Sequence, residues 1–344
     1  MHKLSQELLT LIEKECKGRK HLKLTIGTII NGEKNIQVFN ETGEIPNENY
    51  TYEIGSITKT FAGTLLAKYI HEDKMSLDDS ISKYVDGLDE DTYYPTIKRL
   101  ATHTSGYGFY PFTLRAGIRA FVEPIFTGTR FGGKIPDILN MNEVKMKELI
   151  LSKKVEDKDY PWAYSNFGIG LVGYAIGVAS KKDFQTAMND YLKNDLGMKN
   201  SFVGIKSNIN LEGFANKDKK VDNWNFGESV IASCGAISST ADDMLTYAQL
   251  QMDDELPYLK LAHEKHAPLN KMSDMGLGWV LKKDSNHVIM HTGGTSGFHN
   301  FLVIDKKQKV AYIMLANYLV NLNKFVLTIL SDLEKEVNTK KIVL

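Results

Sequence analysis

The sequence predicts an α+β protein, with an antiparallel sheet formed by both chain ends, flanked by terminal helices, and a mostly helical lobe inserted between the sheet halves. Alternating apolar residues indicate strands at both ends of the chain, whereas the middle carries apolar residues at helical spacing. We therefore expect one domain over residues 1–344. Its α/β lobe would comprise about residues 1–60 and 260–344, and its helical lobe about 61–259.

The N-terminal end supplies a predicted helix and a strand pair. Apolar residues share one helical face within residues 1–17, and Gly18 is a suitable stop. Apolar residues of one parity then predict a strand over residues 22–30. Asn31-Gly32 is a strong signal for a two-residue hairpin turn, so the return strand should follow directly.

The C-terminal end mirrors this arrangement. Apolar runs at 301–304 and 310–315 predict two strands, and residues 325–337 predict an amphipathic helix. A site is expected in the cleft between the lobes, where ligand pockets commonly lie. In the middle of the chain, helical spacing predicts helices at residues 59–70, 169–179, 184–196 and 241–252.

Composition excludes several classes of protein. Lys and Arg total 42 and Asp and Glu total 42, so no overall positive charge attracts nucleic acid. No run approaches the ~20 apolar residues of a membrane helix, so no integral membrane segment is expected. No leader is visible, which predicts a cytoplasmic protein, or an extracellular or cell-envelope one if a leader was removed. Cys16 and Cys234 are too few for a disulfide framework or a four-cysteine zinc site.

Ser56 and Lys59 lie three residues apart at the start of a predicted helix, which places the hydroxyl and the amine on one face. A lysine can serve as the base that activates a serine nucleophile. Ser80 and Lys83 have the same spacing, and we interpret them as part of a solvated segment. The spacing alone is therefore a weak signal for catalysis.

Two further motifs follow in order. Residues 164–166 are the only Tyr-x-Asn in the chain, and residues 291–293 are the only Lys/His-Thr-Gly. With the Ser-x-x-Lys motif at 56–59, the chain resembles the serine β-lactamase and penicillin-binding protein superfamily, in its class C β-lactamase and DD-peptidase-like branch. The resemblance covers nearly the whole chain and implies the fold of that family. It extends to the segments YEIGSITKTFAG, LATHTSG, CGAISSTADDM and HTGGTSGF.

The resemblance also implies roles for individual residues. Ser56 would form an acyl-enzyme, while Lys59 and Tyr164 would carry its proton to the leaving group. The backbone N–H groups of Ser56 and Gly294 would form the oxyanion hole. No metal or other cofactor is implied. The implied substrate-binding residues are Asn166, which would also hydrogen-bond Lys59, and His291, Thr292 and Gly293.

His291 stands where class C β-lactamases have a lysine, and this is closer to the soluble DD-peptidase, D-amino-acid peptidase and esterase members. A neutral histidine would hold a substrate carboxylate less strongly than a lysine, and binding would depend on pH. We expect a serine hydrolase of small molecules or short peptides, most typically with D-configured residues, that β-lactams can acylate. The alternatives are a broad carboxylesterase, a weak class C-type β-lactamase, or a penicillin sensor or binding module that is acylated and releases its product very slowly. The sequence does not indicate the oligomeric state.

Five segments have competing interpretations. His103 is interpreted as a structural hydrogen-bonder and not as a catalyst. Residues 168–173 match the dinucleotide-binding fingerprint, but no preceding strand supports it, so close helix packing is expected. Residues 263–266 fall one residue short of a zinc-protease motif and are expected on the surface. The aromatic segment 107–131 fits a substrate-shaping loop, ordinary packing or a membrane-touching loop. Taken alone, the Tyr-Ser-Asn motif also fits a helix cap.

Overall fold

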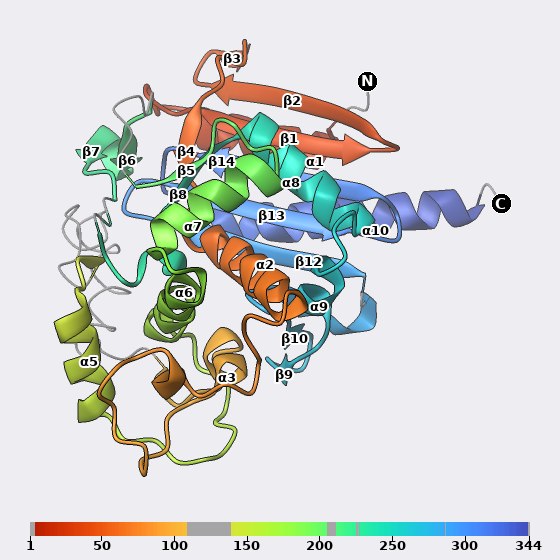
Figure 1. The fold of residues 1–344 in the computed structure, drawn as a ribbon. Coiled ribbons are helices and arrows are strands. Elements are labelled where there is room, and N and C mark those ends of the chain that lie inside the picture. The colour runs from red at the N-terminus through yellow and green to blue at the C-terminus, as the bar shows by residue number, and fades with distance from the viewer. Residues whose placement is uncertain are drawn as a thin grey trace.

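The largest element of the fold is a nine-stranded antiparallel sheet with the strand order β3-β2-β1-β14-β13-β12-β11-β10-β9 (Figure 1). The computed structural model of this protein describes residues 4–108, 139–204, 211–224, 226, 228–285 and 287–342, with side chains up to residue 335. The strands of the sheet are β1 (Leu24–Ile30), β2 (Glu33–Asn40), β3 (Gly43–Ile45), β9 (Ala267–Pro268), β10 (Ser273–Met275), β11 (Val280–Lys282), β12 (Val288–Gly294), β13 (His299–Asp305) and β14 (Val310–Ala316).

Both chain ends build this sheet, as predicted. β1 pairs with β2 across the hairpin and with β14 on its other side, so that Leu24 lies opposite Ala316. Asn31 and Gly32 both have positive φ angles, of 53° and 81°. A two-residue turn with two positive φ angles matches the twist of the flanking strands, which is why Asn-Gly predicted the hairpin.

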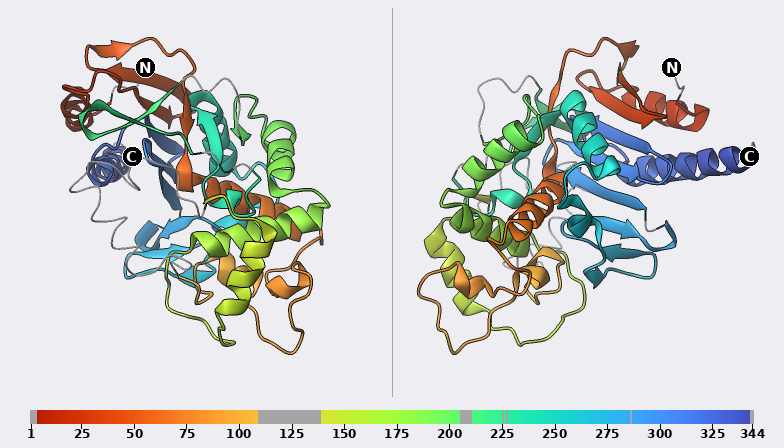
Figure 2. Two further views of the ribbon diagram at one scale, coloured as in Figure 1. Left: turned by 90° about the vertical axis from the view of Figure 1, so that its left-hand side faces the viewer. Right: turned by 45° about the vertical axis from the view of Figure 1, so that its right-hand side comes forward.

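Helices cover both faces of the sheet, as Figures 1 and 2 show. α1 (Gln6–Cys16) and α10 (Leu322–Ile342) pack together over one face, and α8 (Ala241–Asp253) lies against β1 and β14 on the other. Neighbouring residues of β13 therefore belong to different cores: Phe301 packs under α1 and α10, and Leu302 packs under α8. Strands buried on both faces have continuous apolar sequences, as these do. No helix in the described ranges is long and apolar enough to cross a membrane.

The middle of the chain is mostly helical. Its predicted helices are confirmed by α2, α6, α7 and α8, although α7 ends at Asp190 and a π-helical turn, Tyr191–Asp195, continues it. The division into lobes near residues 60 and 260 stays a prediction. The sequence did not predict the three-stranded sheet β4-β8-β5, whose strands are short. The remaining helices of the described structure are α2 (Thr58–His71), α3 (Ile97–Ala101), α5 (Glu143–Ser152), α6 (Asn166–Ser180), α7 (Phe184–Asp190) and α9 (Leu259–His263). Its remaining strands are β4 (Thr51–Glu53), β5 (Phe202–Val203), β6 (Gly213–Ala215), β7 (Lys219–Val221) and β8 (Ile237–Thr240).

The glycines of residues 168–173 serve close packing, as expected. They lie in the first half of α6, and this helix packs against the turn formed by Ala232–Cys234. A Cβ atom at Gly173 would fall 2.3 Å from the Ser233 Oγ. No side chain fits in that space, which explains the spacing without a nucleotide.

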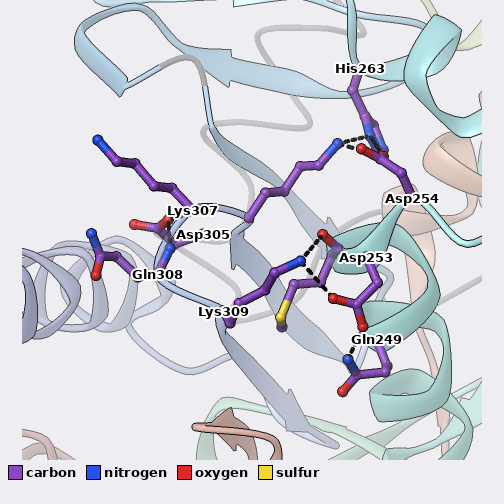
Figure 3. A network of polar contacts seen from close by, with 10 residues as sticks. Gln249, Asp253, Asp254, His263, Asp305, Lys307, Gln308 and Lys309 are labelled. Atoms are coloured by element: carbon purple, nitrogen blue, oxygen red, sulfur yellow. Dashed lines mark hydrogen bonds and ion pairs between the residues drawn. The ribbon is translucent and has the colours of Figure 1, made fainter.

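Polar side chains anchor the turn after β13 to the end of α8 and to α9 (Figure 3). The Lys306 Nζ atom donates to Asp254 at 2.5 Å and to the Nδ1 atom of His263 at 3.0 Å. The other ring nitrogen of His263 lies 2.9 Å from the side-chain oxygen of Gln251. Because the His263 side chain is only 5% exposed, the surface interpretation of residues 263–266 is wrong for this residue. Its ring completes a partly buried network instead.

Candidate active site

Ser56 lies where the chain passes from β4 into α2. Residues Gly55–Ile57 form a single 3-10 turn, and α2 begins at the next residue. Ile54 and Ile57, on either side, are fully buried, whereas Ser56 is half-buried. The core therefore fixes the turn while the hydroxyl stays accessible.

Lys59 follows one helical turn later and is fully buried. Its Nζ atom donates to the Ser56 Oγ at 3.0 Å and to the backbone carbonyl of Cys234 at 2.6 Å. Both acceptors are uncharged. The carbonyl fixes the amine beside the serine, so a proton can pass between the two side chains without movement of the backbone.

Tyr164 approaches the serine from the helical side of the site. Its hydroxyl lies 2.7 Å from the Ser56 Oγ, and the Lys59 Nζ lies 4.9 Å from the centre of its ring. The following residue, Ser165, caps α6 by accepting the N–H of Gly168 at 2.9 Å. Capping is thus done by the middle residue of the Tyr-Ser-Asn motif, and the Tyr164 side chain is left to face Ser56.

His103 packs behind Tyr164 and is a hydrogen-bond acceptor, as interpreted. Its Nδ1 atom accepts the backbone N–H of Ser165 at 3.1 Å, and its ring centre lies 4.9 Å from that of Tyr164. Burial, together with the nearby charge of Lys59, lowers the pKa of His103 to about 3. The ring is therefore neutral near pH 7 and fixes the position of the tyrosine.

Strand β12 forms the opposite wall and runs very close to the serine turn. A Cβ atom at Gly293 would fall 2.0 Å from the backbone oxygen of Ile54. One at Gly55 would fall 2.7 Å from the nitrogen of Gly294. This strand can therefore approach Ser56 only because glycines stand at these positions.

The chain matches a known protein family over most of its length. The family model described as Beta-lactamase matches residues 32–329, which is most of the chain. The chain belongs to the beta-lactamase family. Members of this superfamily are serine hydrolases, which agrees with a serine held between a lysine and a tyrosine.

Individual relatives of this beta-lactamase family member have low sequence identity. Protein flp of Staphylococcus aureus (strain MW2) is 24% identical over 284 residues, which cover 77% of this chain and 52% of that protein. The chain therefore spans about half the length of this curated relative. An octameric penicillin-binding protein homologue from Pyrococcus abyssi has a TM-score of 0.75 and 19% identity, covering 95% of this chain and 77% of the other. A beta-lactamase/D-alanine carboxypeptidase from Pseudomonas syringae has a TM-score of 0.73 and 19% identity, covering 94% of this chain and 98% of the other. These structures confirm the predicted fold.

His291 is uncharged in this beta-lactamase family member. Burial and the nearby charge of Lys59 lower the pKa of His291 to about 4. The Nδ1 atom lies 2.6 Å from the carbonyl of the next residue, Thr292, so Nδ1 carries the proton and donates it to that oxygen. Nε2 is then an acceptor. The Thr292 side chain, by contrast, is exposed beside the strand.

Asn166 occupies the first position of α6, next to the cap. Its side-chain oxygen is buried and has no hydrogen-bond partner among the described residues. The expected hydrogen bond between Asn166 and Lys59 is not formed in the described structure, in which the lysine donates to Ser56 and Cys234.

The second Ser-x-x-Lys pair forms no comparable site. Ser80 caps a short 3-10 helix, and Lys83 pairs with Asp79. The solvated interpretation of this pair is confirmed. Of the aromatic segment 107–131, residues 109 onward lie outside the described residues.

Two contributors to the site could not be named from the sequence. One is the Cys234 carbonyl, which holds Lys59 by its backbone, so no side-chain pattern could reveal it. The other is Glu53, a buried acid three residues before Ser56. An acidic residue within the apolar stretch Tyr-Glu-Ile was the available signal.

Proposed function

We propose that this chain is a serine hydrolase that works through an acyl-enzyme on Ser56. The observation that carries the proposal is that the Ser56 Oγ lies within hydrogen-bond distance of both Lys59, at 3.0 Å, and Tyr164, at 2.7 Å. A serine hydroxyl becomes a nucleophile only when a neighbouring group takes its proton. Two such groups converge here on a half-buried hydroxyl.

The proposed reaction has two halves. Ser56 attacks the substrate carbonyl and its proton moves to Lys59 or Tyr164, whichever is deprotonated at that moment. The bond to the leaving nitrogen or oxygen then breaks, and the same proton is delivered to the leaving group. Water next attacks the ester on Ser56 and gives a proton to the same pair of residues. The bond to the Ser56 Oγ then breaks, that oxygen takes the proton back from the pair, and the acid product leaves. The pair is restored at the end of each cycle.

The backbone around Gly294 supports a further part of the proposal. β12 lies against the serine turn, so the N–H groups of Ser56 and Gly294 are proposed to bind the developing oxyanion. Each such donor contributes ~3 kcal/mol of transition-state stabilisation in enzymes of this kind. Thr292 and Gly293 would hold an extended substrate along the strand, and Asn166 would accept a substrate N–H.

The proposed substrates are short peptides or amides with D-configured residues, and β-lactams are expected to acylate the same serine. Two observations support this choice, namely family membership and likeness to a structure described as a beta-lactamase/D-alanine carboxypeptidase.

A second candidate is an esterase or amidase whose substrates lack a free carboxylate. The neutral His291 favours it, because an uncharged imidazole gives no ionic partner to a carboxylate on this strand. Relative rates on a nitrophenyl ester and a D-Ala-D-Ala peptide would separate the two candidates.

The deciding experiment is intact-protein mass spectrometry after mixing with benzylpenicillin, with the adduct mapped by digestion. A lasting adduct on Ser56 supports a penicillin-binding peptidase or sensor, and a transient one with hydrolysed drug indicates β-lactamase activity. If no adduct forms, a fluorophosphonate probe tests the serine directly. Ser56→Ala should lose every adduct while its thermal unfolding stays close to wild type. Equal labelling of this variant would refute the mechanism.

A further inference from the structure

Glu53 is a buried acid that the proposed reaction does not use. It ends β4, three residues before the nucleophile, and is 4% exposed. One carboxyl oxygen, Oε1, accepts the backbone N–H of Trp224 at 2.5 Å. The backbone oxygen of Glu53 accepts the side-chain amide of Asn300 at 2.8 Å. The residue thus contacts two segments that are distant in sequence.

The same contacts reach the turn that follows β12. The indole N–H of Trp224 donates to the Ser296 Oγ at 2.8 Å, and Ser296 lies two residues after Gly294. Thr295 lies between Gly294 and Ser296 and is fully buried. Its hydroxyl tends to lower the pKa of the Glu53 carboxyl. Glu53 is therefore linked both to the turn that carries Ser56 and to the turn that carries Gly294.

The carboxyl of Glu53 holds a proton at neutral pH. Burial raises its pKa to about 8, while the nearby Thr295 hydroxyl and the Trp224 N–H act in the opposite direction. Both of these neighbours are uncharged, and no charged side chain of the described residues is among the groups that shift this pKa. The Oε2 atom and the Thr295 hydroxyl are both buried, and neither has a hydrogen-bond partner among the described residues. A proton on Oε2 would join these two oxygens.

We propose that Glu53 is a positioning residue for acyl transfer, which in its protonated form ties the Ser56 turn to the turn after β12 and thereby sets the spacing of the Ser56 and Gly294 amides. The inference rests on the proposed function. When the proton leaves, the carboxyl loses its one donor and leaves a buried negative charge without a cation to balance it. The two turns then separate or admit water, and oxyanion stabilisation falls.

The test is the rate at which a fluorophosphonate probe labels Ser56 between pH 6 and pH 10. In wild type the rate should fall severalfold above about pH 8. Glu53→Gln keeps an acceptor for Trp224 and a donor for Thr295 without a titratable proton. This variant should be labelled readily at pH 7 and should lose the alkaline fall, or shift it upward by at least about one pH unit. The exposed Glu48→Gln is the matched control and should leave the profile unchanged.

Circular dichroism at each pH separates loss of positioning from loss of fold, because the fall in labelling should occur while the protein is still folded. A wild-type rate that keeps rising through pH 9, or an alkaline fall that persists in Glu53→Gln, overturns the inference while the proposed function stands. If Ser56 is not labelled at any pH, the proposed function fails and the inference fails with it. If Glu53→Gln does not fold, the wild-type profile still tests the inference. A fall in the labelling rate above about pH 8 supports it, and a rate without that fall overturns it.

Discussion

Lys59 and Lys306 are both placed by hydrogen bonds to other segments, but their partners differ in charge. Lys59 is fully buried and donates to a serine hydroxyl and a backbone carbonyl. Lys306 donates to a carboxylate, Asp254, and to a histidine nitrogen. Lys306 is engaged by a carboxylate in an ion pair, whereas the Lys59 amine has only uncharged partners and one of them is the Ser56 hydroxyl. The comparison distinguishes a lysine suited to chemistry from one suited to holding two segments together.

The histidines beside these lysines make the same distinction. His263 accepts a hydrogen bond from Lys306 within the network of Figure 3, so it belongs to the structural cluster. His103 accepts a backbone N–H and packs on Tyr164, so it acts on the site only through the tyrosine. Neither histidine contacts Ser56 directly in the described structure. The chemistry at Ser56 is therefore left to the lysine and the tyrosine.

The largest effect should come from exchanging Lys59 for methionine. Acylation of Ser56 should slow by ~10²-fold or more, because the loss of a proton acceptor usually has that effect. Lys306→Met is the matched control, since it removes an amine of the same length from the other cluster. It should lower the unfolding temperature and leave the acylation rate of the folded protein within about twofold. Stopped-flow acylation and thermal unfolding measure the two effects, and similar loss of rate in both variants would remove the distinction.

Tyr164→Phe should have the next largest effect. It removes the hydroxyl 2.7 Å from Ser56 but keeps the ring that packs on His103. Acylation should slow by roughly 10- to 100-fold, less than for the lysine variant if Lys59 can still take the serine proton. The acylation rate against pH should also change shape, because one of two coupled proton acceptors is lost. An unchanged rate and profile would place Tyr164 outside the proton path.

His291→Lys tests the opposite wall of the site. The wild-type histidine has a pKa of about 4, so it should stay uncharged between pH 5.5 and 7.5 and gain charge only below that range. Affinity for a peptide with a free carboxylate should therefore be flat across the range. The lysine variant should bind the same peptide roughly tenfold more tightly, as a charge-assisted hydrogen bond allows. The inhibition constant of the peptide in an ester assay measures this, and a wild-type affinity that rises between pH 7.5 and 5.5 would contradict the neutral state.

The smallest effect concerns stability. Burial alone would raise the pKa of the Asp254 carboxyl, but the hydrogen bond and charge of Lys306, with the His263 ring beside the carboxylate, outweigh it and lower the pKa to about 2. The Asp254 carboxylate therefore stabilises the folded protein at pH values above 3.8, the pKa of an unperturbed aspartate. This stabilisation is lost as the pH falls toward 2. Asp254→Asn should cost about 1 kcal/mol at pH 7, after allowance for solvent screening, with little change in acylation. Urea unfolding at pH 7 and pH 3 measures it, and an equal loss at both pH values would argue against the ion pair.

Local patterns predicted much of the fold. Asn31-Gly32 required a turn with two positive φ angles, and helical spacing placed α2 and α8 to within one residue at each end. The short strands β9 to β11 and β4, β5 and β8 were missed, because two to four residues carry too little periodicity to reveal a strand. Their pairing is determined by contacts between distant segments.

By itself, the sequence determined that a Ser-x-x-Lys pair begins a helix and that Tyr-x-Asn and His-Thr-Gly motifs follow in order. Only the tertiary structure decided that the first such pair, and not Ser80 with Lys83, meets a tyrosine. It also decided that a carbonyl of Cys234 fixes Lys59, and that Glu53 is buried. The sequence sets the type of each residue. Burial and neighbouring groups determine whether a titratable side chain holds a proton, and both arise only when distant segments of the chain pack together.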